Sequence, residues 1–207
     1  RAGIQLVSAD AASWIGSVVR EQCPDAVLCI DPFHVVAWAT KALDQVRREM
    51  WNELRDRGET DRAKAMKGSR WALVKNPEDL TRKQKRKLRA IEEDNRRLFK
   101  SYLMKEQLRD IFKTKGTLAT YMLDAWLGWV GHSKNEPFKK VARAIRDNRD
   151  GIDAALVYGL SNARLEASNT KLKLLTRMAF GFHSHAPLIA LAMLKLGGLC
   201  PPLPRLA

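Results

Sequence analysis

The sequence predicts an α/β fold with a small parallel βαβ unit near the amino terminus, a large all-helical stretch and further helices at the carboxyl end. Two short apolar runs flank a helix-like segment within about 30 residues, the length of one βαβ unit. Helical periodicity then begins at Phe33, and no convincing strand returns before the end. With 207 residues and 45% apolar content, the chain is long enough to bury a core.

The βαβ unit is indicated by three successive patterns. Residues 4–8 have the pattern of a short strand, and residues 11–22 have helical spacing until Pro24 stops the helix. The apolar run over residues 26–30 is too short for a helix and lies between two prolines, which favours a buried strand. Because a strand, a helix and a strand follow one another, the two strands are expected to be parallel.

The rest of the chain is predicted to be helical. A long helix follows Phe33 along one apolar stripe that reaches Leu54, and Gly58 is expected to end it. Further helices are expected to start after Thr81 and to cover residues 96–113, 118–132, 138–148, 150–158 and 161–177. Trp126 and Trp129 lie on an apolar helical stripe and are expected in the core, with base stacking as the alternative.

These patterns predict three regions. Residues 1–48 would form part of an α/β core, residues 49–158 a basic helical insertion, and residues 159–207 a return to the core with a carboxy-terminal helix.

The charge of the chain predicts a polyanionic partner. Its 37 Lys and Arg exceed its 23 Asp and Glu, which leaves +14. Between residues 67 and 89, nine basic residues face only two acids, a net charge of +7. Lys83 and Arg86 lie in the first turns of the expected helix there, where phosphate oxygens would be natural partners. The alternative is a solvated basic surface.

The composition also restricts the compartment. No apolar run approaches the roughly 18 residues of a spanning helix, and the most apolar stretch, 186–199, contains Lys195. The chain has three cysteines, Cys23, Cys29 and Cys200, and no two of them form a CxxC pair. This argues against a disulfide framework and a structural zinc site, although Cys23, Cys29 and His34 could be imagined as ligands, and favours a reducing cytoplasm. No signal peptide is evident and Arg1 replaces an initiating Met, so we expect upstream sequence.

Two carboxylates are expected at the carboxyl ends of the two parallel strands. Asp10 lies just past the first expected strand, and Asp31 directly follows the second. Ligands of open α/β sheets bind at the carboxyl ends of the strands, so both are candidate catalytic acids. Helix capping is the alternative explanation, because Asp is a common cap and Asp10 precedes a helix.

A polar stripe is expected on the helix over residues 161–177. Its members recur every three or four residues and are Asn162, Glu166, Asn169, Lys173 and Arg177. They lie opposite an apolar stripe formed by Leu165, Leu172 and Leu175. A solvated face would explain the spacing, but an acid among amides and cations also suits a metal ligand beside a phosphate backbone.

Two ordered motifs resemble the ISL3 family of insertion-sequence transposases. The first is Asp31-Pro32-Phe33-His34-Val35-Val36 after an apolar strand. The second is Ser161-Asn162 with Glu166, Asn169, Lys173, Arg177 and Ala179-Phe180-Gly181-Phe182. The resemblance covers nearly the whole chain and implies a partial ribonuclease-H-like core with a helical insertion. It also implies an acidic-triad (DDE) site using Mg²⁺ or Mn²⁺, action on transposon ends and target DNA, a homo-oligomer on DNA, and a bacterial cytoplasmic, nucleoid-associated location.

The resemblance also assigns roles to residues. Glu166 matches the final acid of the triad, and Asp10 is favoured over Asp31 as the second, because the Asp31 motif stands where related families carry a Cys-x-x-His element. His34 would orient a carboxylate or a phosphate. DNA contacts are expected from Asn162, Asn169, Lys173, Arg177, Lys83 and Arg86.

The first acid would lie on an earlier strand that this sequence lacks, so the chain alone is expected to be inactive. Two other hypotheses remain open: a non-catalytic nucleic-acid-binding helical protein, and a helical interaction module with a solvated basic stretch.

Overall fold

The structure is a computed structural model that describes residues 3–197, apart from the side chains of residues 164 and 165. The chain divides into two compact units, Arg1–Ser161 and Asn162–Ala207, and each is described by itself. The boundary predicted after residue 158 lies close to this division. The boundary predicted after residue 48 falls inside one long helix.

The first unit begins with the predicted βαβ arrangement. Strand β1 (Leu6–Ala9) and strand β2 (Val27–Ile30) pair in parallel, joined through helix α1 (Ser13–Gln22). The strands start later than predicted, but the parallel pairing is confirmed. These two strands form the whole sheet within residues 3–197, so a larger ribonuclease-H-like sheet stays a proposal.

Helix α9 (Arg149–Tyr158) packs closely against β2. The approach is possible because residue 151 is glycine: a Cβ there would lie 2.7 Å from Ile30 Cγ1 and 3.3 Å from the Leu28 carbonyl oxygen. Helix α9, the last helix of the first unit, thus packs on the strand pair at the start of the chain.

Gly151→Ala is expected to lower the free energy of unfolding by about 1–2 kcal/mol, because overpacking against buried Ile30 outweighs the better helix propensity of alanine. Urea unfolding followed by circular dichroism measures this. Gly128→Ala is the matched control, since a Cβ at this helical glycine meets nothing within 4 Å. Equal stability of the two variants would contradict the close packing.

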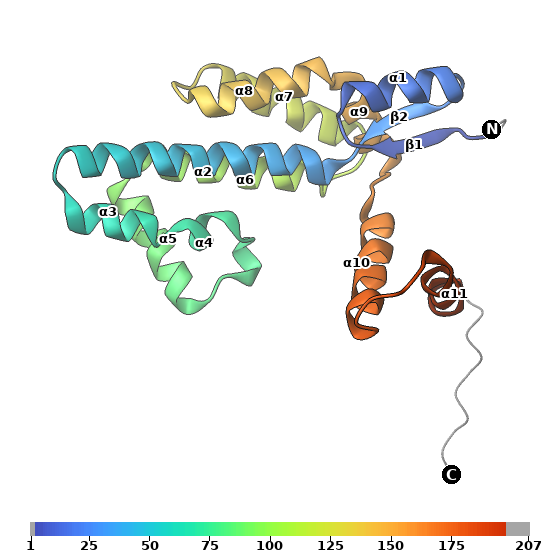
Figure 1. Cartoon of the computed structure of the whole chain (residues 1–207). Helices are drawn as coiled ribbons and strands as arrows, with labels where there is room; N and C mark the ends of the chain where they lie inside the picture. Colours follow the sequence, from blue (N-terminus) through green and yellow to red (C-terminus); the bar gives the residue numbers. More distant parts are fainter. Residues whose placement is uncertain (1–2, 198–207) are drawn as a thin grey trace, which may run out of the picture. The chain divides into compact units, whose positions relative to one another are not determined.

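The long helix predicted after Phe33 is α2 (Pro32–Asp56), which spans about 37 Å. As predicted, Gly58 follows its end, with a φ of 76°. Figure 1 shows α2 lying beside α6 (Arg96–Ile111), with α8 (Glu136–Asp147) along another side.

The remaining elements of this unit are α3 (Thr60–Lys67), α4 (Arg70–Val74), the 3₁₀ turn η1 (Pro77–Asp79), α5 (Arg82–Asp94) and α7 (Thr117–Gly131). The predicted start of α5 is confirmed by a capping box. Gln84 N donates to Thr81 Oγ1 at 3.3 Å, and Thr81 N donates to Gln84 Oε1 at 2.9 Å. Helices α3 and α4 lie in the region predicted to be helical, but their bounds were not predicted.

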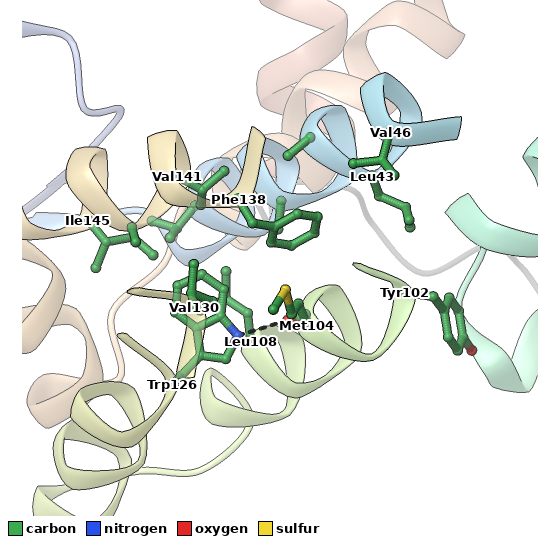
Figure 2. Packing of buried hydrophobic residues seen from close by; sticks show 14 of the residues in the cluster. Leu43, Val46, Tyr102, Met104, Leu108, Trp126, Val130, Phe138, Val141 and Ile145 are labelled. Atoms are coloured by element: carbon green, nitrogen blue, oxygen red, sulfur yellow. Dashed lines mark hydrogen bonds between the residues drawn. The ribbon is translucent and has the colours of Figure 1, made fainter. Parts of the chain in front are cut away.

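The core of the first unit lies among α2, α6, α7 and α8 (Figure 2). Trp126 is fully buried, and its Nε1 donates to the Met104 carbonyl at 2.9 Å. The predicted core position of Trp126 is confirmed, and stacking on a base is excluded for it. Trp129 is half-buried against the same cluster, with Lys100 Nζ 5.9 Å from its ring centroid.

An ion-pair network joins η1 to α6. Arg109 donates to both carboxylate oxygens of Glu78 at 2.7 and 2.9 Å and to Glu106 at 3.1 Å. Buried Lys105 pairs with Glu106 and donates to the Leu73 carbonyl at 3.1 Å, near the end of α4. The side chains of α6 thus hold the polar turn before α5.

This network predicts a contribution to stability that is lost in acid. The hydrogen bond from Arg109 lowers the pKa of Glu78 to about 2, below the roughly 4.3 of an unfolded chain. The contribution should be complete above about pH 5 and vanish as pH falls through about 2. Unfolding curves for wild type and Glu78→Gln should therefore differ by a constant amount near neutrality and converge in acid. A difference that grows in acid would contradict this.

The second unit contains α10 (Ala163–Met178) and α11 (His185–Leu196), which pack on each other. After α10 the backbone turns through Phe180 and Gly181, with positive φ values of 53° and 99°. In residues 3–197, no helix has both the length and the apolar character needed to cross a membrane.

Candidate active site

The carboxyl ends of β1 and β2 bring the two predicted acids together. Asp10 follows β1 and Asp31 follows β2, and parallel pairing of neighbouring strands places both at one edge. His34 joins them from the first turn of α2. One donor atom from each of the three side chains lies within 4.8 Å of the others.

His34 connects the two carboxylates. Its Nε2 lies 2.7 Å from Asp10 Oδ1 and 3.9 Å from Asp31 Oδ2. The side chain of Asp31 is only 1% exposed, whereas those of Asp10 and His34 are 46% and 34% exposed. The cluster therefore has a buried base formed by Asp31 and an open side formed by Asp10 and His34.

The capping explanation holds for one acid and not for the other. Asp31 is the N-cap of α2, where its Oδ1 accepts from Phe33 N at 3.4 Å. The N-cap of α1 is Ala12, so Asp10 does not cap the helix that it precedes. Capping therefore explains the position of Asp31 in part and leaves Asp10 free for another role.

The donor set suits a hard divalent cation. Asp10 and Asp31 offer carboxylate oxygens, the preferred ligands of Mg²⁺, and Mn²⁺ also accepts the imidazole nitrogen of His34. The exposed side of the cluster leaves room for oxygens from a substrate. Cys29 is buried, which raises the pKa of its thiol, and neither Cys29 nor Cys23 joins the cluster. Cys200 lies outside the described residues.

The polar stripe predicted downstream lies on α10, in the second unit. Glu166 is half-buried in the first turn, and its backbone N donates to the Asn162 carbonyl at 2.9 Å. Asn169, Lys173 and Arg177 are exposed at successive turns. Leu172 and Leu175 lie on the other side, half-buried and buried, while the side chain of Leu165 lies outside the described residues.

Lys173 and Arg177 line a shallow hollow with Thr176, Gly181 and Phe180. Phe180 is fully exposed, so the second unit presents two cations beside an aromatic ring.

A comparison with protein families identifies the chain. The family model DDE_Tnp_ISL3, described as "Transposase", matches residues 1–192. The chain belongs to the ISL3 transposase family.

Curated relatives agree with the family. The transposase for insertion sequence element IS1557 of Mycobacterium tuberculosis, from strains H37Rv and CDC 1551, is 48% identical over 98% of this chain and 50% of its own length. The transposase for IS1001 of Bordetella parapertussis is 25% identical over 86% of this chain and 44% of its own length. The chain thus spans about half the length of these relatives. No solved structure matches it.

A separate group of exposed cations lies on α5. Lys87 donates to the Gly68 carbonyl at 2.8 Å, so it holds α3 and α5 together. Five other cations of α5 are exposed, with no ion pair among the described residues: Arg82, Lys83, Lys85, Arg86 and Arg89. Helix α5 packs on α4 and α6, so the structure does not bring Lys83 or Arg86 into the acidic cluster.

Proposed function

We propose that this chain forms the greater part of a DDE catalytic domain of an insertion-sequence transposase, which cleaves DNA strands and joins them to target DNA. The observation that carries the proposal is the cluster of Asp10, Asp31 and His34 at the ends of two parallel strands. Membership of the ISL3 family supports this chemistry.

Asp10 and Asp31 would hold the divalent cation, Mg²⁺ or Mn²⁺, through their carboxylate oxygens. His34 is a positioning residue that fixes the orientation of Asp10 through their 2.7 Å contact. When bound, the cation would stabilise the negative charge that develops on phosphate oxygens. Buried Asp31 would keep a fixed position, since it is also held at the start of α2.

Glu166 is proposed to complete the acidic site from α10. Its polar stripe supports this role: Lys173 and Arg177 would hold the phosphate backbone while the acid faces the cation. Asn162 and Asn169 would add hydrogen bonds to the same strand. We place the first acid of the triad in the part of the full-length transposase that this chain does not span, in agreement with its coverage of about half of the relatives.

The reaction proceeds in two displacements at phosphorus. A water oxygen first bonds to the phosphorus atom while the bond to the 3′-oxygen breaks, which leaves a 3′-hydroxyl and a 5′-phosphate. The 3′-hydroxyl oxygen then bonds to a target phosphorus while another 3′-oxygen leaves. No protein nucleophile is needed. Tyr102 fits this scheme as a structural residue, because burial raises its pKa to about 12.

The test uses a full-length transposase that contains this chain, incubated with DNA carrying the ends of its own element. Cleavage to 3′-hydroxyl ends is expected with Mg²⁺ or Mn²⁺ and not with a chelator, and oligomer formation on the DNA is followed by light scattering. DNA binding without cleavage under any metal would instead support a non-catalytic DNA-binding protein, for which the exposed cations of α5 are the favouring observation.

His34→Ala in that protein is expected to lower the cleavage rate by about 10–100-fold, because a residue that orients a ligand typically contributes this much. His34→Gln should restore part of the rate, since its amide can still donate to Asp10. The dependence of rate on Mg²⁺ concentration should shift to higher concentrations in His34→Ala. An unchanged metal dependence would contradict a positioning role for His34.

A further inference from the structure

A groove of about 430 Å³ runs between α2 and α8, separate from the residues given a role above. Trp38, Lys41, Gln45 and Arg48 of α2 line one side, and Lys140 and Val141 of α8 line the other. Three of these side chains are cationic, and no carboxylate lines the groove. Its composition therefore favours an anionic ligand.

The groove continues the stripe of α2 on which His34 stands. His34, Trp38, Lys41, Gln45 and Arg48 follow one another at spacings of four, three, four and three residues, which places them on one face of the helix. Lys41 and Arg48 lie about 10 Å and 21 Å along the axis from His34. The cations that α2 contributes to the groove thus lie on the same face of this helix as His34 of the acidic cluster.

Neighbouring acids leave most of this positive charge uncompensated. Lys41 and Lys140 are exposed and form no ion pair among the described residues. Arg48 is 62% exposed and lies 3.5 Å from Asp44, which also pairs with Arg47 at 2.8 Å. On α8, the nearest acid, Glu136, pairs with Lys139.

We propose that this groove binds the phosphodiester backbone of the DNA strand whose scissile phosphate lies at Asp10 and Asp31. This inference rests on the proposed function. Lys41 and Arg48 lie about 10 Å apart along α2, so they would contact phosphates of nearby nucleotides in the same strand. Trp38 and Val141 provide an apolar floor for the sugars between the cations.

The experiment measures binding of the 207-residue chain to a fluorescein-labelled DNA duplex by anisotropy over a series of salt concentrations. Lys41→Gln/Lys140→Gln is expected to weaken binding about tenfold or more at low salt and to reduce the slope of log K against log salt by about 2. Lys64→Gln/Lys113→Gln is the control for the loss of net charge. Both lysines are exposed outside the groove, and replacing them removes the same total charge. Lys41→Arg/Lys140→Arg should bind like wild type.

Equal weakening in the groove variant and the control would overturn the proposal. Circular dichroism confirms that each variant is folded. The experiments distinguish failure of the groove proposal from failure of the proposed function. If DNA binding depends on the groove but the full-length protein never cleaves DNA, only the catalytic function is rejected. Metal-dependent cleavage with unchanged binding by the groove variant would reject the groove alone.

Discussion

Glu166→Gln in the full-length transposase is expected to reduce strand cleavage at least about a thousandfold, equivalent to about 4 kcal/mol of transition-state stabilisation. The amide keeps the size of the side chain but removes the negative charge that a divalent cation requires. Asp10→Asn should cause a loss of the same order, for the same reason. Initial rates with Mg²⁺ at saturating DNA measure both effects.

The Asp31→Asn variant tests whether Asp31 has the same role as Asp10. The family resemblance favours Asp10 as the second acid, whereas the structure places both beside His34. If Asp31 mainly caps α2, its amide variant should retain most of the activity, since Asn also caps helices well. If Asp31 holds the cation, its loss should match that of Asp10. Glu92→Gln, at an exposed acid of α5, is the control and should cleave like wild type. Unaltered cleavage in both Glu166→Gln and Asp10→Asn would reject the assigned acids.

Trp126→Ala is expected to lower the free energy of unfolding by about 3–5 kcal/mol. The substitution leaves a large cavity among α6, α7 and α8. It also removes the hydrogen bond that the Met104 carbonyl accepts from Trp126 Nε1. Urea unfolding monitored by circular dichroism measures the loss.

Trp14→Ala is the control for the tryptophan substitution. Trp14 is 69% exposed on α1, and its truncation should change the free energy of unfolding by no more than about 0.5 kcal/mol. A loss in Trp126→Ala no larger than in Trp14→Ala would contradict the packing seen in Figure 2.

Strong local signals explain which elements could be predicted from the sequence. The apolar run between Pro24 and Pro32 indicated the second strand, and the turn-like residues 76–81 indicated the start of α5. The bounds of α3 and α4 were missed because these helices have only eight and five residues, too few for an apolar stripe to repeat. Their positions depend on packing against α2, which local patterns do not describe.

The candidate site was predictable only in part. Strand ends identify Asp10 and Asp31, because the chain must leave a parallel sheet at a common edge. The contact between His34 and Asp10 depends on how α2 leaves β2. The groove was not predicted, because Lys41 and Lys140 are distant in sequence and meet only when α8 packs on α2.

In the full-length transposase on DNA, the proposed site brings Asp10, Asp31 and Glu166 within reach of one divalent cation. Iron-mediated cleavage of the protein tests this arrangement: Fe²⁺ replaces Mg²⁺, and ascorbate with peroxide generates radicals that cut the nearby backbone. We expect cuts beside Asp10, between Asp31 and His34, and beside Glu166, all suppressed by excess Mg²⁺. Cuts in the first two segments without any beside Glu166 would contradict it.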